Sequence, residues 1–219
     1  MTVNLDSTKQ AFIKLAVECE VLSFGKFTLK SGRASPYFFN AGKFDSGKAL
    51  AVLGECYADA IVDSGIEVDA LFGPAYKGIP LVAATSSSLY TKYQRNYPMC
   101  FNRKEAKDHG EGGVLVGAEL DEKKVLVLDD VITAGTAVEE VVTLLKQHRA
   151  TLSGVLVGLD RQERAADSEQ SAMQQLATKY GAPVLSIVTL DDIRQYLSAS
   201  VNDSALLSRV DDYREQYGV

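Results

Sequence analysis

The stretch that decides the fold is LVLDDVITAGTAV, residues 126–138. Its first three residues form a short apolar run, as expected for a strand that is covered on both faces. Asp129 and Asp130 end this run, and four small residues follow at 133–136 (TAGT). From about Ala137 a helix is predicted, because apolar residues recur on one face at i, i+3, i+4 and i+7. The segment therefore predicts a buried strand, a tight loop and a helix.

This arrangement suits a phosphorylated ribose. A helix N-terminus offers unpaired N–H groups and about half a positive charge, which together attract a phosphate. The two acids suit a pair of sugar hydroxyls or a metal, and both reach one ligand only if the strand stops by Asp129. A purely structural reading stays open, because Thr136 and Glu139 match a capping box that needs no ligand.

Strands and helices alternate along most of the chain. Helices are predicted at 7–20, 46–62, 79–94, 137–148, 168–180, 190–197 and 203–216. Strands are predicted at 24–29, 36–39, 71–72, 99–101, 125–128, 155–159 and 184–188. This order favours one α/β domain over 1–219 with a mostly parallel sheet and helices on both faces. We expect residues 43–189 to form its core, and about 1–42 with the last helices to form a small cap.

Polar or glycine-rich loops follow three of the predicted strands. They are Gly73–Gly78, Asp129–Thr136 and Asp160–Arg161. Because ligands of open α/β sheets bind at the carboxyl ends of the strands, we expect these loops to meet at one site.

Composition narrows the class of protein. The chain has 219 residues and a net charge of −6, which disfavours a nonspecific nucleic-acid or anionic-membrane binder. Three cysteines in apolar-rich segments are typical of reduced thiols in a cytoplasmic protein. No signal peptide is evident, and no apolar run has the length of a membrane span.

Several segments resemble a known family in the right order. LVLDDVITAGTAV is similar to the phosphoribosyl-pyrophosphate (PRPP) motif of type I phosphoribosyltransferases. Within that family, four further segments resemble the orotate phosphoribosyltransferases: FTLKSGRASPYFFNAG (27–42), LFGPAYKGIPL (71–81), CFNRKEAKDHGEGG (100–113) and LDRQER (159–164). The resemblance implies a type I phosphoribosyltransferase-like fold and Mg²⁺-dependent transfer of ribose 5-phosphate from PRPP to N1 of orotate, in pyrimidine biosynthesis.

The resemblance also implies roles for residues of this sequence. Those placed at PRPP are Lys30, Tyr76, Lys77, Arg103, Lys104, Lys107, His109, Asp129, Asp130, Val131, Ile132, Thr133, Ala134, Gly135, Thr136 and Ala137. Those placed at orotate are Lys30, Phe38, Phe39, Thr133 and Arg161. Those expected to act in catalysis are Lys107, His109, Asp129 and Asp130. Mg²⁺ is expected mainly on PRPP and water, with Asp129 or Asp130 as a further contact.

The segment 103–113 is expected to be a mobile, cationic lid over the pyrophosphate, since three glycines lie at 110–113. The resemblance implies that it reaches a neighbouring subunit, so the active unit is a homodimer. The alternative interpretation of segment 103–113 is an exposed, charged loop that has no function. Without the resemblance, Lys77 is also consistent with a solvated lysine on a loop, and Phe38 and Phe39 are also consistent with ordinary core residues. On a strand these two rings face opposite ways, so at most one lies flat on the base.

Three alternative functions make different demands on the sequence. A sister transferase would use a purine base or uracil. A ligand-sensing regulator that binds nucleic acid would need a basic stripe or an added DNA-binding domain, and neither is apparent. A response-regulator-like receiver would explain the acids, but not the lysine-rich glycine loop.

Overall fold

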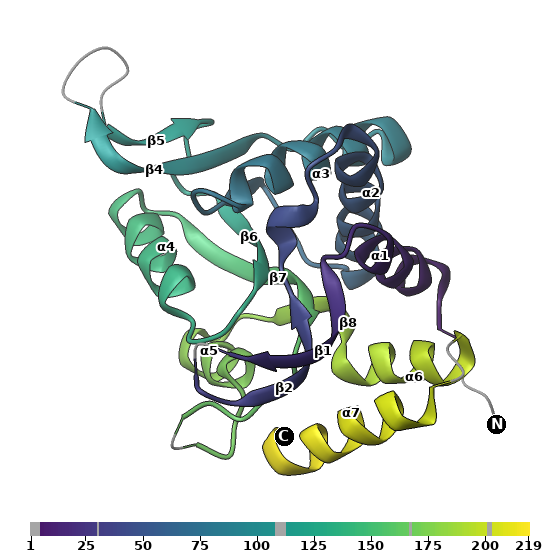
Figure 1. Cartoon of the computed structure of the whole chain (residues 1–219). Coiled ribbons are helices and arrows are strands. Elements are labelled where there is room, and N and C mark those ends of the chain that lie inside the picture. Colours follow the sequence, from purple (N-terminus) through teal and green to yellow (C-terminus); the bar gives the residue numbers. More distant parts are fainter. Residues whose placement is uncertain (1–4, 30, 108–112, 167, 201–202) are drawn as a thin grey trace.

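The computed structural model describes residues 5–29, 31–107, 113–166, 168–200 and 203–219, with only the backbone described for 106 and 107. Its centre is a six-stranded sheet in the order β5-β4-β3-β6-β7-β8 (Figure 1). All neighbouring strands are parallel except β4 and β5, which are antiparallel. The predicted mostly parallel sheet is therefore confirmed.

The elements follow the predicted alternation, with bounds that differ by a few residues. The helices are α1 (Ser7–Glu18), α2 (Gly47–Ser64), α3 (Gly78–Tyr93), α4 (Thr136–Gln147), α5 (Ala172–Tyr180), α6 (Leu190–Ser200) and α7 (Ser204–Tyr217), with a short 3-10 turn at Ala41–Lys43. The strands are β1 (Leu22–Thr28), β2 (Ala34–Phe39), β3 (Ala70–Gly73), β4 (Met99–Lys107), β5 (Gly113–Gly117), β6 (Lys124–Val131), β7 (Thr151–Asp160) and β8 (Val184–Thr189).

Helices cover both faces of the sheet, as the apolar run of β6 requires. Leu126 and Leu128 face the core that lies under α1, α2 and α3, whereas Val125 and Val127 face the core under α4 and α5. All four side chains are fully buried. Figure 1 shows the two helix groups on opposite sides of the strands. This packing holds the end of β6, and the two acids on it, in one place.

The first two strands form a sheet of their own. β1 and β2 pair antiparallel, outside the six-stranded sheet, and α7 packs against β2. In Figure 1 this hairpin crosses in front of the sheet, beside α7. α1, which precedes the hairpin, packs against α2 and β8. The hairpin and α7 thus lie together, while α1 belongs to the helix layer over the main core.

Two predictions about elements were wrong. The strand predicted at 99–101 runs on to Lys107 through mostly polar residues, and β5, whose apolar run is only three residues long, was not predicted at all; the two strands pair with each other. The helix predicted from 168 begins at Ala172, since Ser171 caps it in a capping box with Gln174. No helix in the described ranges is long and apolar enough to cross a membrane.

Candidate active site

Asp129 and Asp130 lie at the end of β6, between its neighbours β3 and β7. β6 continues to Val131, so the strand does not stop by Asp129, the condition set for both acids to reach one ligand. The acids are nevertheless coupled: burial and the adjacent Asp130 carboxylate raise the pKa of Asp129 to about 7. The Asp129 carboxylate accepts a hydrogen bond from the backbone N–H of Asp130, 2.9 Å away. Asp129 therefore keeps its proton to a higher pH than an ordinary aspartate does.

Tyr57 of α2 holds the backbone of this acid pair, a role that the sequence analysis did not predict. Its hydroxyl donates to the Asp129 carbonyl oxygen at 2.7 Å, and its ring is 1% exposed. Burial raises the pKa of Tyr57 well above its ordinary value, so it remains a neutral donor. Gly158 of β7 leaves room for this contact, since a Cβ there would come within 3.0 Å of the Tyr57 hydroxyl.

The loop between β6 and α4 presents its polar groups to solvent. Thr133, Ala134, Thr136 and Ala137 are exposed, and Gly135 takes the left-handed backbone conformation, with φ of 78°. Only a residue without Cβ adopts this conformation readily, so Gly135 allows the sharp turn into α4.

The capping box that offered a structural reading of this loop is not formed. Gly135 is the N-cap and makes no side-chain cap hydrogen bond, and Thr136 is already helical. Glu139 instead forms an ion pair with Lys179 of α5, so its charge points away from the loop. Within the described ranges, the hydroxyls of Thr133 and Thr136 make no hydrogen bond, so they remain available to a ligand.

The Gly73–Gly78 loop reaches the acid pair through Lys77. The Lys77 Nζ lies 2.8 Å from the Asp130 carboxylate, and the Asn102 side chain of β4 accepts a hydrogen bond from the Ala75 N–H at 2.9 Å. Neither glycine has a positive φ; the loop ends approach so closely that a Cβ on Gly73 would lie 2.1 Å from the Gly78 carbonyl oxygen. The glycines are thus needed for close approach rather than for unusual torsion angles.

A cavity of about 130 Å³ adjoins this ion pair. Its lining includes Phe39, Tyr57, Lys77 and Asp130. Tyr76, beside Lys77, is 71% exposed. The predicted PRPP residues Lys77 and Asp130 thus lie at one opening, and Tyr76 is the exposed residue next to Lys77 in the chain.

The predicted lid residues lie partly on a strand. Arg103 and Lys104 belong to β4, and the Arg103 guanidinium donates to the Gly113 carbonyl across the hairpin at 3.2 Å. These two residues therefore lie on a strand, where a loop was predicted, and their role in a lid stays a prediction. Lys107 has its backbone on β4, and His109 lies outside the described residues. A second cavity, of about 230 Å³, is lined by Arg103, Lys104 and Ala137 among others.

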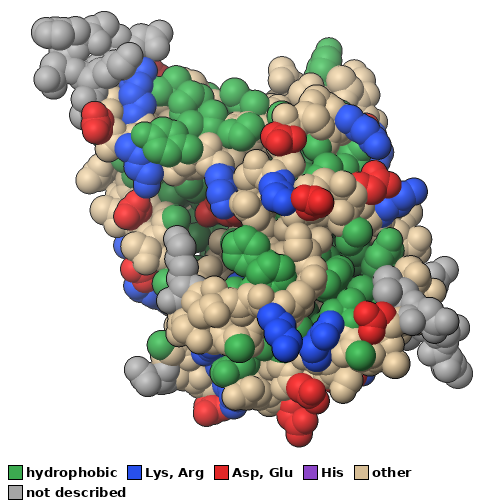
Figure 2. Space-filling view, viewed as in Figure 1, with side chains coloured by type: hydrophobic (Ala, Val, Ile, Leu, Met, Phe, Trp, Pro, Cys, Tyr) green, Lys and Arg blue, Asp and Glu red, His purple; other side chains and the backbone are tan. Residues whose placement is uncertain are grey.

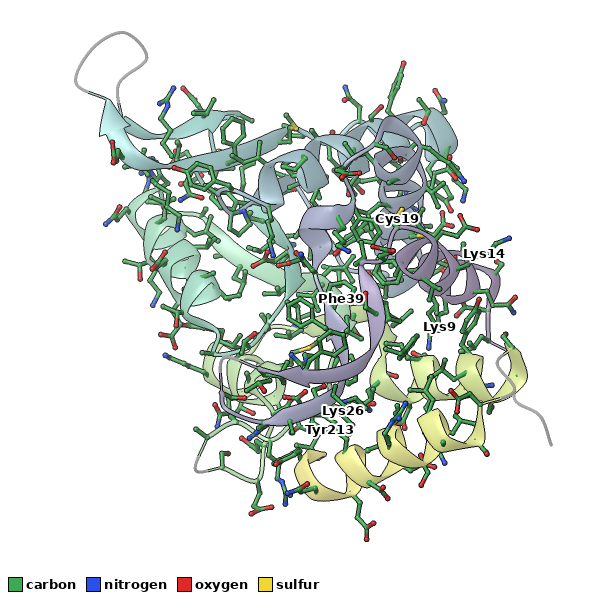
Figure 3. All side chains as sticks on the ribbon, viewed as in Figure 1. Lys9, Lys14, Cys19, Lys26, Phe39 and Tyr213 are labelled. Carbon is green, nitrogen blue, oxygen red and sulfur yellow. The ribbon has the colours of Figure 1, made fainter. Side chains whose placement is uncertain are left out.

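The predicted orotate residues come from β2 and from the loop after β7. Phe38 is 41% exposed and stacks on Phe27, with ring centroids 5.6 Å apart. Phe39 faces the other way and stacks on Phe12 at 6.5 Å; it is one of the side chains that Figure 3 labels. The two rings thus face opposite ways, as the strand alternation predicts: Phe38 is the more exposed ring, and Phe39 lines the cavity beside Lys77 and Asp130. Lys30 lies outside the described residues.

Arg161 is bound into a buried polar network. Its side chain is 16% exposed, its Nη2 lies 2.6 Å from the Glu163 carboxylate, and its Nε donates to the Tyr37 hydroxyl at 3.3 Å. The guanidinium carbon lies 5.2 Å from the Tyr37 ring centroid, a cation–π distance. Burial opposes the charge of Arg161, but Tyr37 and Glu163 outweigh it and raise the pKa of the guanidinium further. The sequence reasoning missed Tyr37, which only the fold brings to Arg161, and Glu163, which lies two residues further along the same motif.

A metal would find few protein ligands here. Among the described residues, no group of three His, Cys, Asp or Glu side chains is placed to hold an ion. Two adjacent carboxylates remain at Asp129 and Asp130. This fits Mg²⁺, which is commonly bound through one or two carboxylates and the phosphates of a substrate.

Comparison with known proteins gives one consistent result. Residues 42–183 match the model of the phosphoribosyl transferase domain. The orotate phosphoribosyltransferase of Pseudomonas aeruginosa is 55% identical over 98% of this chain and 100% of its own, and that of Salmonella typhi is 54% identical over 96% and 98%. The crystal structure of the Francisella tularensis orotate phosphoribosyltransferase superposes with a TM-score of 0.87 at 47% identity, covering 95% of this chain and 99% of the other.

Proposed function

The chain belongs to the phosphoribosyltransferase family and, within it, to the orotate phosphoribosyltransferases, and we propose that Asp129–Ala137 forms its PRPP site. The family reaction joins N1 of orotate to C1 of PRPP, which gives orotidine 5′-phosphate and pyrophosphate in pyrimidine biosynthesis. The C1–O bond to pyrophosphate breaks as the C1–N1 bond forms. The observation that carries the site assignment is the meeting of Asp130, Lys77 and the exposed 133–137 loop at one edge of the sheet.

The acid pair binds the ribose. Asp130, with Asp129 beside it, accepts hydrogen bonds from the 2′- and 3′-hydroxyls. A carboxylate next to the ring also favours the positive charge that develops at C1 as pyrophosphate departs. Tyr57 keeps the acids in place through its hydrogen bond to the Asp129 carbonyl.

The loop from Thr133 to Ala137 binds the 5′-phosphate. The first N–H groups of α4 have no partner inside the helix and carry its positive partial charge. The Thr133 and Thr136 hydroxyls add two donors. Each hydrogen bond to the phosphate charge contributes about 1.5–3 kcal/mol, so a few of them anchor the sugar.

Lys77 binds the pyrophosphate. In the structure it neutralises Asp130 at 2.8 Å, so PRPP binding replaces one ion pair with two contacts, from Lys77 to pyrophosphate and from Asp130 to ribose. This exchange keeps each charge paired before and after binding. Tyr76 flanks the same leaving group, and its exposed side chain is free to close over it.

Orotate binds on the side of Phe38 and Arg161. The planar guanidinium of Arg161 suits the carboxylate or ring carbonyls of orotate. The exposed ring of Phe38 offers a flat apolar surface to the base. Figure 2 shows exposed hydrophobic side chains near the middle of one face, with Lys and Arg side chains above and below them. Such a surface suits a flat anion.

The reaction depends on Mg²⁺, which we place on PRPP with Asp129 or Asp130 as its protein contact. Held there, the ion would supply positive charge that offsets the negative charge of the departing pyrophosphate. The active unit is a homodimer, in which the 103–113 segment reaches the neighbouring site and supplies Lys107 and His109.

The protein is cytoplasmic, in keeping with three free thiols, two of them buried.

A spectrophotometric assay of orotate consumption with PRPP and Mg²⁺ tests the function. Turnover with a purine base or uracil, but not orotate, would move the chain to a sister transferase. Asp130→Ala tests the site: it weakens PRPP binding by about 1–3 kcal/mol, the loss of one or two charged hydrogen bonds, and leaves the melting temperature little changed. A collapse of the melting temperature would instead make the acid structural.

A further inference from the structure

Four polar groups from separate parts of the chain converge on the Glu163 carboxylate. Arg161 Nη2 lies 2.6 Å from it, and the Tyr213 hydroxyl of α7 donates to it at 2.8 Å. Arg33, just before β2, pairs with it at 3.3 Å, and the Tyr37 hydroxyl of β2 donates to it at 3.4 Å. The carboxylate is only 15% exposed. Figure 3 shows Tyr213 on α7 beside the β1–β2 hairpin.

We infer that Glu163 is the positioning residue for Arg161 and that Tyr213 completes this brace, so that α7 sets the affinity for orotate. The inference rests on the proposed contact between Arg161 and orotate. Arg161 uses Nε and Nη2 inside the network, through Tyr37, Tyr213 and Glu163. Its Nη1 has no hydrogen-bond partner among the described residues and is not one of the buried unpaired atoms there. Nη1 is thus the part of the guanidinium left for a ligand.

The backbone around Glu163 is fixed by the same end of α7. The Arg164 N–H donates to the Tyr217 carbonyl at 2.9 Å, and the Val219 N–H donates to the Gln162 carbonyl at 3.0 Å. Glu163 and Gly218 form an isolated antiparallel bridge. An arginine held in this way has lost its rotamer freedom before orotate arrives, and such preorganisation increases affinity.

The charge of Glu163 and its positioning of Arg161 predict opposite changes in the affinity for orotate when the Glu163 carboxylate is lost. The network contains two guanidinium groups, of Arg33 and Arg161, and one carboxylate. Removing the carboxylate charge makes the site more positive, so electrostatics alone would tighten the binding of anionic orotate. Loss of the brace instead lets Arg161 leave its position, which weakens binding.

Steady-state kinetics of Glu163→Gln, in the full-length enzyme with both substrates varied, tests the brace. The glutamine keeps the size of the side chain and removes its charge. We expect the KM for orotate to rise about tenfold, as for the loss of about 1.4 kcal/mol of binding, while the KM for PRPP changes by less than about twofold. Glu169→Gln is the matched control, because Glu169 is 92% exposed and, within the described part of the chain, pairs only with Arg164, at 3.5 Å. It should leave both KM values unchanged.

Two further variants distinguish loss of the brace from misfolding and from an effect that does not act through Arg161. Tyr213→Phe removes only the hydroxyl bonds, so it decides the matter even if Glu163→Gln does not fold, and it should raise the KM for orotate several-fold. In an Arg161→Ala background, Glu163→Gln should have no additional effect on that KM, because Glu163 acts through Arg161.

An orotate KM that falls or stays constant in Glu163→Gln, while Arg161→Ala raises it, would overturn the brace and leave the orotate site intact. A Tyr213→Phe variant that folds and keeps the native KM for orotate would also overturn the brace and leave the orotate site intact. If Arg161→Ala itself leaves the orotate KM unchanged, the proposed contact of Arg161 fails, and the brace fails with it. A lowered melting temperature with both KM values unchanged would show that the network is merely structural.

Discussion

Asp129→Asn should stabilise the folded protein, and more strongly as the pH rises. Burial and the Asp130 carboxylate raise the pKa of Asp129 to about 7 from an ordinary 3.8. A carboxyl whose pKa is raised by folding binds its proton more tightly in the folded state, so stability falls as the pH rises from 3.8 toward 7. At about 1.4 kcal/mol per pKa unit, the loss amounts to a few kcal/mol at about pH 8 and is clearly smaller at about pH 5. Asparagine removes this loss and still accepts the hydrogen bond from the Asp130 N–H.

Urea denaturation followed by circular dichroism at about pH 5 and about pH 8 measures this effect. The gain in unfolding free energy of Asp129→Asn over the native chain should be larger by about 2–3 kcal/mol at the higher pH. Asp63→Asn, at an exposed position on α2, is the control and should change stability by less than about 0.5 kcal/mol at either pH. Equal gains at both pH values would refute the reasoning. Asp129→Asn should also bind PRPP more weakly, because a charge that destabilises the fold is retained where it serves binding or catalysis.

Two other predictions concern the backbone around the site. Gly73→Ala should destabilise the fold by about 1–3 kcal/mol or more, because its Cβ would lie 2.1 Å from the Gly78 carbonyl oxygen; thermal melting checks this against Gly47→Ala, where a Cβ meets nothing within 4 Å. An unshifted melting temperature for Gly73→Ala would contradict the close approach. Tyr57→Phe should lower the unfolding free energy by about 1–3 kcal/mol, because it leaves the Asp129 carbonyl without its buried donor, and should raise the KM for PRPP. A loss of stability with unchanged PRPP kinetics would show that Tyr57 supports the core alone.

Local pattern predicted well wherever burial imposes a period on the sequence. The apolar run of β6 and the helical stripe of α4 both lie where they were predicted, since each must present apolar side chains to a core at fixed intervals. Pattern failed at β4 and β5. The residues of β4 beyond Phe101 are mostly polar, and β5 has only three apolar residues between two glycines, so neither pattern indicated the antiparallel pairing that joins them.

The capping box shows the same limit at a single position. Thr136 and Glu139 have the right spacing, but the left-handed turn at Gly135 moves the start of α4 by one residue. Glu139 then lies next to Lys179, which comes from a different helix and is 40 residues away in sequence. A spacing rule considers neighbours along the chain only, whereas the ion pair is made across the fold.

The amino-acid sequence by itself determined the order of strands and helices, the polar loops at the strand ends and the family to which they belong. These properties are local, because each depends on a side-chain period or on a short motif. Only the tertiary structure decided that Tyr57 holds the Asp129 backbone, that Lys77 pairs with Asp130, and that α7 reaches Arg161 through Glu163. Those contacts join residues between 50 and 72 positions apart, and packing around the sheet is what brings them within hydrogen-bonding distance.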